Sequence, residues 1–364
     1  MKGSTVLAQG RIERIGQAGG VCPNYEAALA TCMDSITGEG KALASVSELA
    51  GIGFKAVHAG PLSGTRLIDD EVLAAMEEFS FLAPAHNPPY IAAMRAFRHA
   101  MPEVPLVALF ETAFFDALDE ATVTYAVPYR WKESHGVRRY GFHGASHRAA
   151  SERARQLCIG DLSNGSNLRH ISCHLGGSSS LAAVRGGVAV DTSFGISPQS
   201  GLPQNNRVGD FDVFAALYVM EKHGLTVAGM ARTLASEAGL AGIAGGSGDV
   251  RDLSEAAARG DARARLALDV FVRSVRHYLG AFLVHLGGLD VLTFSGGIGE
   301  NSAEVRTAVC AGLAAFGIEL DAERNAGLRG EGRISRDGAA VAVLVLPADE
   351  ETVVARAVAA FLGL

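Results

Sequence analysis

The chain has 364 residues, and its 32 Lys and Arg against 39 Asp and Glu leave a formal net charge of −7. Hydrophobic residues make up 48% and charged residues 20%, a balance that excludes an intrinsically disordered protein. The acidic charge argues against general binding of nucleic acid or of an anionic membrane surface. No apolar run reaches the roughly 18–20 residues that a membrane helix needs. At about 150 residues per domain, the length predicts two domains.

The cysteines and the N-terminus bear on the compartment. The five cysteines are scattered, odd in number and without a CxxC pair, which indicates reduced thiols rather than disulfides or a zinc site. The N-terminus has no apolar signal core. We therefore expect a cytoplasmic protein. Glycine is abundant, with 44 residues, so the positions of the glycines carry most of the information.

The first part of the chain alternates strands and helices. Alternating polarity or short apolar runs predict strands, and 3.6-residue periodicity predicts helices. The predicted elements are a strand over 5–15, a strand over 53–58, a helix over 71–79, a loop over 84–89, a helix over 90–100 and a strand over 104–110.

The second part begins with short apolar strands joined by glycine turns, which predict a meander of hairpins. A long helix, two further strands and two more helices follow. The predicted elements are strands over 170–175, 180–184 and 188–191, a helix over 261–286, a strand over 290–294, a turn over 295–302, a helix over 303–316, a strand over 341–346 and a helix from 352. The pattern indicates an α/β protein with mixed sheets.

Three glycine-rich segments could bind phosphate or nucleotide. SGGIGENS (295–302) joins a strand to a helix, and CHLGGSSS (173–180) forms a hairpin tip that exposes backbone N–H groups and hydroxyls. AGGSGDVR (244–251) places Asp249 and Arg251 where a ribose or adenine edge would fit. Each segment also has a purely structural interpretation, as a capped turn or surface loop.

Histidines and an arginine gather in three other motifs. RRYGFHGASH (138–147) carries His143 and His147, but its glycines make a helical metal pair unfavourable. NNRVGDFD (205–212) places Arg207 in a polar turn, and APAHNPP (83–89) is a proline-rich loop that holds His86. Each motif alone says little.

Read in order, these motifs resemble the acetate kinase family. The matching segments are GFKAVHAG, LAPAHNPP, FETAF, RRYGFHGASH, CHLGGSSS, VDTSFGISP, NNRVGDFD, GDVRD, SGGIGENS and PADEE. The resemblance runs colinearly from residue 6 to the C-terminus, and the stretch GISPQSGLPQNNRVGD is closer to an acetate/propionate kinase branch. It implies the two-lobed, duplicated actin/hexokinase/Hsp70-type (ribonuclease H-like) α/β fold with an incomplete first lobe. The lobes would be 1–115 with helix 352–364, and 116–351 for most nucleotide contacts.

The resemblance also implies functional residues. The catalytic set would be Arg207, His143, Lys55, Glu111, His86 and His174. The nucleotide set would be His174, Gly176, Gly177, Ser178, Asp249, Val250, Arg251, Gly296, Gly297, Ile298, Gly299 and Asn301. The substrate set would be Lys55, Val57, Ala85, Phe142 and Pro198, and the metal set would be Glu350 and Glu111.

The implied reaction is reversible, direct in-line phosphoryl transfer from ATP to a short-chain carboxylate such as acetate or propionate. A carboxylate is already ionised, so the reaction needs charge neutralisation and positioning rather than a general base. Arg207 and Lys55 would screen the two anions, and His143 would donate a hydrogen bond to the phosphoryl group. Mg²⁺ or Mn²⁺ would be the metal. The resemblance further suggests a homodimer.

The sequence departs from the family at several positions. The family's N-terminal Asn-x-Gly-Ser-Ser/Thr-Ser phosphate turn has no convincing counterpart, which suggests either a start upstream or an impaired relative. Lys55 replaces an arginine, Glu111 an aspartate, Gly177 an asparagine and Phe115 a histidine. Ala85 replaces a larger aliphatic residue, which would widen the acyl pocket.

Alternative functions remain open at this level. One is a kinase for a larger or hydroxylated acid, and another is a nucleotide-binding protein without turnover. A histidine-based metal hydrolase is disfavoured because His86, His143 and His174 lie in separate loops.

Overall fold

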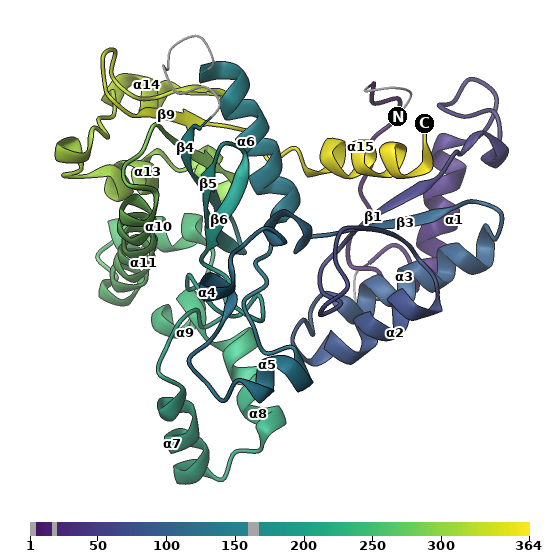
Figure 1. The fold of residues 1–364 in the computed structure, drawn as a ribbon, viewed down its shortest axis with the longest axis horizontal. Coiled ribbons are helices and arrows are strands. Elements are labelled where there is room, and N and C mark those ends of the chain that lie inside the picture. The colour runs from purple at the N-terminus through teal and green to yellow at the C-terminus, as the bar shows by residue number, and fades with distance from the viewer. Residues whose placement is uncertain (1–4, 17–19, 159–166) are drawn as a thin grey trace. The chain divides into compact units, whose positions relative to one another are not determined.

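The computed structural model describes residues 5–16, 20–158 and 167–364 (Figure 1). The chain divides into two compact units. The first comprises Met1–Asp116 and Glu350–Leu364, and the second comprises Ala117–Asp349. The last helix therefore belongs with the first part of the chain.

The first unit contains a three-stranded sheet in the order β1-β3-β2. Its strands are β1 (Ile52–Ala56), β2 (Thr65–Leu67) and β3 (Leu106–Phe110). β3 is central and all five of its residues are buried, as its unbroken apolar run LVALF predicts. β1 pairs with it in parallel and β2 antiparallel.

Helices complete the first unit. They are α1 (Tyr25–Ile36), α2 (Asp70–Glu78), α3 (Asn87–Ala100) and α15 (Glu350–Leu362), with 3₁₀ turns at Val46–Glu48, Phe79–Phe81 and Ala113–Phe115. Asp69 caps α2 by accepting a hydrogen bond from the Val72 N–H at 2.9 Å. α15 packs against β1 because Gly53 has no side chain. A Cβ there would lie 2.9 Å from Val358 and 3.0 Å from Val354.

The second unit contains a six-stranded sheet in the order β6-β5-β4-β7-β9-β8. Its strands are β4 (Arg169–Leu175), β5 (Ser179–Arg185), β6 (Val188–Thr192), β7 (Val291–Ser295), β8 (Gly332–Arg333) and β9 (Ala342–Val345). β4, β5 and β6 form the predicted antiparallel meander, and β4, β7 and β9 are parallel. The expectation of mixed sheets is therefore confirmed.

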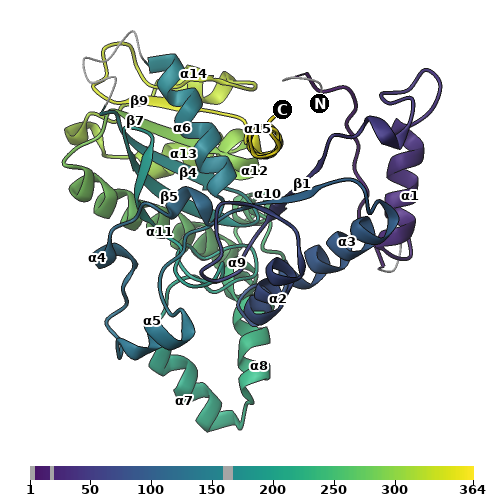
Figure 2. The ribbon, with the colours of Figure 1, turned by 45° about the vertical axis from the view of Figure 1, so that its right-hand side comes forward.

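The helices of the second unit are α4 (Glu120–Val123), α5 (Arg130–His135), α6 (Gly144–Cys158), α7 (Val213–His223), α8 (Val227–Arg232), α9 (Gly239–Ala244), α10 (Val250–Ala258), α11 (Ala262–Leu286), α12 (Gly296–Asn301), α13 (Ala303–Cys310) and α14 (Ala322–Gly327), with a π-helix at Thr233–Glu237 and a 3₁₀ turn at Ala314–Phe316. Some of these helices pack on this sheet, whereas others, α7 and α8 among them, extend away from it (Figures 1 and 2).

α11 and α6 flank the sheet of the second unit on opposite faces (Figures 1 and 2). Leu292 of β7 belongs to the large core under α11, whereas its neighbour Val291 packs in a smaller core with Ala150 and Ala154 of α6. The alternation follows from strand geometry, in which successive side chains point to opposite faces. Each central strand is consequently buried on both sides.

Four predicted elements differ from the structure. The strand expected over 5–15 is wrong, because residues 6–13 are irregular and Val6 and Leu7 are exposed. A strand needs a pairing partner, which an alternating pattern alone does not supply. The segment 295–302 is not a simple turn, since α12 occupies most of it. The loop expected over 84–89 is shorter than predicted, because α3 begins at Asn87 and has its prolines in the first turn, where a helix tolerates them.

The helix expected over 303–316 is also too long. α13 ends at Cys310, because Ala311 leaves the helical conformation with a ψ of 128° and Gly312 follows with a φ of 71° before the short 3₁₀ turn. None of the described helices is long and apolar enough to cross a membrane.

Candidate active site

The tip of the β4–β5 hairpin is the centre of the second unit's polar site. The Gly176 N–H donates to the Ser179 hydroxyl at 3.1 Å, and that hydroxyl donates to the Gly176 carbonyl at 3.0 Å. The side chain of Asn205 lies over the tip, where a Cβ on Gly177 would come within 3.4 Å of it. The hairpin is therefore a rigid backbone turn with small residues at its surface, a form that suits phosphate.

Arg207 lies against this hairpin. Its Nη1 donates to the Ser178 hydroxyl at 3.3 Å and to Gln204 Oε1 at 3.1 Å. Burial lowers the pKa of Arg207, but a guanidinium stays protonated at neutral pH. The structure thus brings together two segments that the sequence analysis singled out separately.

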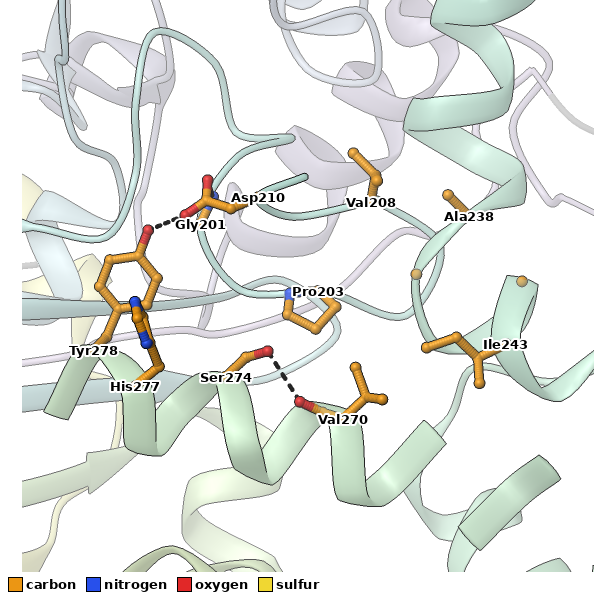
Figure 3. A pocket seen from close by; sticks show the side chains of 12 residues that line it. Gly201, Pro203, Val208, Asp210, Ala238, Ile243, Val270, Ser274, His277 and Tyr278 are labelled. Atoms are coloured by element: carbon orange, nitrogen blue, oxygen red, sulfur yellow. Dashed lines mark hydrogen bonds between the residues drawn. The ribbon is translucent and has the colours of Figure 1, made fainter. Parts of the chain in front are cut away.

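Hydrogen bonds to Asp210 stabilise the loop that carries Arg207. Asp210 Oδ1 accepts from the Gly201 N–H at 2.8 Å, and Asp210 Oδ2 accepts from the Tyr278 hydroxyl. Tyr278 lies on α11, and both side chains line a pocket of about 500 Å³ (Figure 3). Sequence reasoning missed Tyr278, since nothing local to residue 278 points to a loop 68 residues away.

The same loop requires glycine. Gly209 has a φ of 76°, and a Cβ there would lie 2.6 Å from the Pro203 nitrogen. Gly239, at the start of α9, has a φ of 61° and would place a Cβ 2.2 Å from the Gln204 carbonyl oxygen. These close approaches hold the loop in one conformation.

Three histidines cluster beside the hairpin. The rings of His143 and His174 lie 4.3 Å apart, and those of His143 and His147 lie 6.4 Å apart. His143 Nδ1 shares a hydrogen bond of 2.8 Å with the Ser180 hydroxyl, and His174 Nδ1 one of 2.7 Å with the Ser146 hydroxyl. His143 has a φ of 58°, an unfavourable conformation for a residue with a Cβ.

α12 begins next to this cluster. His174 of β4 is in register with Ser295 of β7, directly before the helix. Gly296 has a φ of 75°, and a Cβ there would lie 2.7 Å from the Leu175 carbonyl oxygen, so only glycine fits. The Gly297 nitrogen lies 3.8 Å from the position that a Cβ on Gly176 would take. The predicted nucleotide-binding segment 295–302 therefore begins beside the tip of the β4–β5 hairpin.

The remaining nucleotide residues lie at the start of α10. Asp249 caps this helix by accepting from the Arg251 N–H at 2.9 Å, so the capping interpretation of this segment is confirmed. The Arg251 guanidinium also donates to Asp249 at 2.6 Å and is largely exposed. Val250 is buried beneath them. A role for Asp249 and Arg251 in nucleotide binding stays a prediction.

The first unit has a charged cluster of its own. Lys55 Nζ of β1 donates to Glu350 Oε2 at the start of α15. Burial opposes the charged form of Lys55, but Glu111 and then Glu350 outweigh it and raise the pKa of Lys55. Burial raises the pKa of the neighbouring Tyr90 hydroxyl, which sequence reasoning did not single out. Lys55 and Glu350 line a cavity of about 720 Å³.

The other predicted site residues are divided between the units. His86, Ala85 and the buried Val57 belong to the first unit, with Ala85 exposed. In the second unit, Phe142 is buried and packs edge-on against Phe194, with ring centres 5.5 Å apart. The Pro198 carbonyl accepts from Gln204 Nε2 at 2.7 Å, beside the Arg207 loop.

The two carboxylates expected to hold metal suit a hard cation. Both Glu111 and Glu350 act electrostatically on Lys55, so they lie in one cluster, and Glu111 is buried. Mg²⁺ in proteins is commonly held by one or two carboxylates together with substrate phosphates and water. Among the described residues, no group of three His, Cys, Asp or Glu side chains could hold a metal alone. The donor set fits a metal that is shared with a phosphate ligand.

Comparison with known proteins identifies the class of protein first. The acetate kinase of Porphyromonas gingivalis superposes with a TM-score of 0.85 at 36% identity, covering 97% of this chain and 92% of that one. A propionate kinase of Francisella tularensis gives 0.83 at 32% identity, with coverages of 92% and 84%. The fold is thus the two-domain actin/hexokinase/Hsp70-like fold of these phosphotransferases, as the sequence predicted.

The family follows from the sequence matches. A model described as the acetokinase family matches residues 7–356. An acetate kinase of Shouchella clausii is 41% identical over 373 residues, which cover 98% of this chain and 93% of that protein. One from Bacillus cereus is 38% identical over 372 residues with the same coverages. The chain belongs to the acetokinase family, so the resemblance seen in the motifs is confirmed.

Proposed function

We propose that the protein transfers the γ-phosphoryl group of ATP reversibly to a short-chain carboxylate, most simply acetate, and forms an acyl phosphate. The strongest support is the hydrogen bond from Arg207 to Ser178 at the tip of the β4–β5 hairpin (the phosphate hairpin), beside His143 and His174. Membership of the acetokinase family supports ATP as the phosphoryl donor.

The second unit would bind the nucleotide. The hairpin N–H groups and the Ser178 hydroxyl would hold the phosphates, and the start of α12 together with Asp249 and Arg251 would hold the nucleoside. Arg207 would neutralise charge on the transferred group and on the attacking carboxylate. His143 and His174 would donate hydrogen bonds to the equatorial oxygens as charge spreads over them in the transition state.

The first unit would supply charge for the carboxylate and the metal. Lys55 carries the positive charge that a carboxylate substrate requires, although it lacks the bidentate fork of an arginine. Glu111 and Glu350 would hold Mg²⁺, with Mn²⁺ as a substitute. When bound, the metal would neutralise phosphate charge. Lys55 also donates a hydrogen bond to Glu350, so it would compete with the metal for that carboxylate.

The residues that would select the acid's alkyl group are Val57 and Ala85 in the first unit and Phe142 and Pro198 in the second. Ala85 is small, so propionate should compete with acetate, since one methylene in an apolar pocket is worth about 1–3 kcal/mol. A kinase for a larger or hydroxylated acid remains the second candidate, and the size of Ala85 is the feature that favours it.

The test is ATP-dependent formation of acyl phosphate, trapped as the hydroxamate, with acetate, propionate and butyrate in parallel. We expect turnover with acetate and propionate, its loss on chelation of divalent cations and its return with Mg²⁺. ATP binding without hydroxamate for any acid would contradict the proposal. Turnover with a hydroxylated acid alone would favour the second candidate.

The protein would act as a homodimer. Several large apolar side chains are exposed on and just before α7, and neighbouring exposed apolar side chains often mark an interaction surface. They are Phe211, Val213, Phe214, Leu217 and Tyr218. Light scattering should give twice the chain mass of 37.8 kDa, and Phe214→Asp with Leu217→Asp should reduce it to that of one chain. A monomeric wild type would disprove the dimer.

A further inference from the structure

A chain of four hydrogen-bonded side chains ends at His143. Ser172 Oγ of β4 lies 2.9 Å from His147 Nδ1, and His147 Nε2 lies 2.8 Å from Ser180 Oγ of β5. Ser180 Oγ then lies 2.8 Å from His143 Nδ1. Ser172, His147 and Ser180 are fully buried. All four residues belong to the second unit.

His147 is neutral at physiological pH. Burial, followed by the nearby His174 and His170, holds the pKa of His147 well below its ordinary value. A neutral imidazole carries one N–H, so one of its ring nitrogens donates and the other accepts. Each Ser hydroxyl also has a single hydrogen to donate. If Ser180 accepted from both histidines, its own buried O–H would lack an acceptor, so the hydrogen bonds all point in the same direction from Ser172 to His143 or the reverse.

The buried end at Ser172 selects the direction. The bond to His147 is the one hydrogen bond that the Ser172 side chain makes among the described residues. If His147 donated to Ser172, the Ser172 O–H would be a buried donor with no acceptor, which costs about 1–3 kcal/mol. If Ser172 donates to His147 instead, the oxygen merely leaves a lone pair unused. Ser172 is therefore the donor.

The remaining protons follow. With Nδ1 accepting from Ser172, His147 carries its hydrogen on Nε2 and donates to Ser180. The Ser180 hydroxyl then donates to His143 Nδ1, which leaves the His143 hydrogen on Nε2. His174 follows the same rule, because the buried Ser146 hydroxyl bonds to its Nδ1. A Cβ on Gly176 would lie 3.9 Å from His174 Nε2, so this nitrogen lies close to the phosphate hairpin.

We propose that Ser172, His147 and Ser180 are positioning residues that fix His143 as the Nε2–H tautomer, ready to donate to the transferred phosphoryl group. This inference rests on the proposed function for its consequence, although the tautomer itself does not depend on turnover. A fixed neutral donor needs no reorganisation during the reaction, which is the source of the catalytic advantage of preorganised dipoles. No proton leaves or enters the chain in this role.

The direct test is the protonation state of His143 in the wild-type protein. Long-range ¹H–¹⁵N correlation spectra of histidine-labelled protein separate protonated from unprotonated ring nitrogens, and His143→Gln assigns the signals. We expect His143 and His147 both to carry the hydrogen on Nε2. In Ser180→Ala, the His143 signals should shift toward a mixture of tautomers. A His143 Nδ1–H tautomer in the wild type would overturn the proposal.

Kinetics give the second readout. Ser180→Ala should lower kcat about 10- to 100-fold with little change in KM for ATP or acetate, because His143 itself remains. His147→Leu should do the same, and His147→Gln should recover part of the loss, since a glutamine amide can still donate to Ser180. Equal kcat values for Ser180→Ala and wild type would also overturn the proposal.

Thr293→Val is the matched control. The Thr293 hydroxyl bonds at 2.8 Å to His170, another fully buried histidine, whose bond lies outside the chain to His143. This variant removes a buried hydroxyl of the same kind, so kcat should stay within about twofold of wild type. Failure of the wild type to form any acyl phosphate would instead refute the proposed function, and the spectra would still decide the tautomer.

Discussion

The two units of the molecule hold their polar groups in different ways. In the second unit, Arg207, His143 and His174 are fixed by hydrogen bonds to neutral groups and by backbone turns that admit only glycine. In the first unit, Lys55 and its two glutamates are held by opposite charge, and Lys55 forms an ion pair with Glu350. Geometry therefore governs the second site, and charge balance governs the first.

The difference has a physical consequence for substitutions. A hydrogen-bonded, buried network loses its function when one donor is removed, because the partner cannot find water. A partly exposed charge cluster responds instead to any ion that enters it, because the electrostatic balance shifts. The predictions that follow separate these two behaviours.

The largest effect is expected at Arg207. Arg207→Ala should lower kcat by about 10²–10³-fold, since one preorganised donor to the transition state is removed. Arg207→Lys should recover little, because a lysine ammonium cannot present the planar pair of donors of a guanidinium to the phosphoryl and carboxylate oxygens. Hydroxamate formation with acetate measures both. Arg232→Ala, at an exposed arginine paired with Glu237, is the control. Unchanged kcat in Arg207→Ala would remove the basis of the proposed site.

Lys55 tests the charge cluster. Lys55→Gln should lower kcat/KM for acetate by about 10- to 100-fold through loss of the cation. The same change should lower the Mg²⁺ concentration that gives half-maximal activity, because Lys55 no longer competes for Glu350. Titration of activity with Mg²⁺ checks this. Lys132→Gln, in the Lys132–Glu120 pair of the second unit, should leave both quantities near wild type. A rise in the Mg²⁺ requirement of Lys55→Gln would contradict the charge argument.

Tyr278 tests whether the hydrogen bonds to Asp210 stabilise the Arg207 loop. Tyr278→Phe removes the hydroxyl that donates to Asp210 and should lower stability by about 1.5–3 kcal/mol, the range for a bond to a charged group. kcat should fall by less than about tenfold, since Gly201 still donates to Asp210. Urea unfolding and kinetics measure the two effects. Ser274→Ala is the control in the same pocket, because within the described part of the protein its hydroxyl bonds only to the carbonyl of Val270 on its own helix (Figure 3).

The smallest effect is a pH dependence of stability. Burial lowers the pKa of His170 to about 3. Between the unfolded value near 6.5 and about 3, the unfolded chain binds a proton that the folded chain does not. Stability should therefore fall as the pH drops below 6.5, by about 1.4 kcal/mol per pH unit for this group.

The variant His170→Gln isolates this contribution. Between pH 7.5 and pH 5, the wild type should lose roughly 2 kcal/mol more unfolding free energy than the variant, as measured by urea denaturation. Equal losses would mean that His170 is not held neutral in the folded protein.

Much of the fold was predictable because the decisive patterns are local. Neighbouring residues alone predict three of the elements. They are β3 from its apolar run, the β4–β5–β6 meander from its glycine turns, and α11 from its long helical periodicity. The strand expected over 5–15 failed for the opposite reason, because alternation states only that a strand is possible. α12 was missed since six residues are too few to show a helical period.

The candidate site divides in the same way. The motifs around Arg207 and Gly297 are visible in the sequence because the neighbouring Gly209 and Gly296 lie where a Cβ would come within 2.6 and 2.7 Å of backbone atoms. The sequence by itself therefore determined which segments carry the chemistry and which family they resemble.

Only the tertiary structure decided which side chains support them. Ser180 and His147 bond across 33 positions, Tyr278 reaches Asp210 across 68, and Lys55 meets Glu350 across 295. No periodic pattern in the sequence predicts such pairs, because the packing of strands and helices, and not the spacing along the chain, sets the distance between the two residues. The proton that we propose on His143 depends on the Ser172–His147, His147–Ser180 and Ser180–His143 bonds, which span 25, 33 and 37 positions, so it is a property of the folded protein.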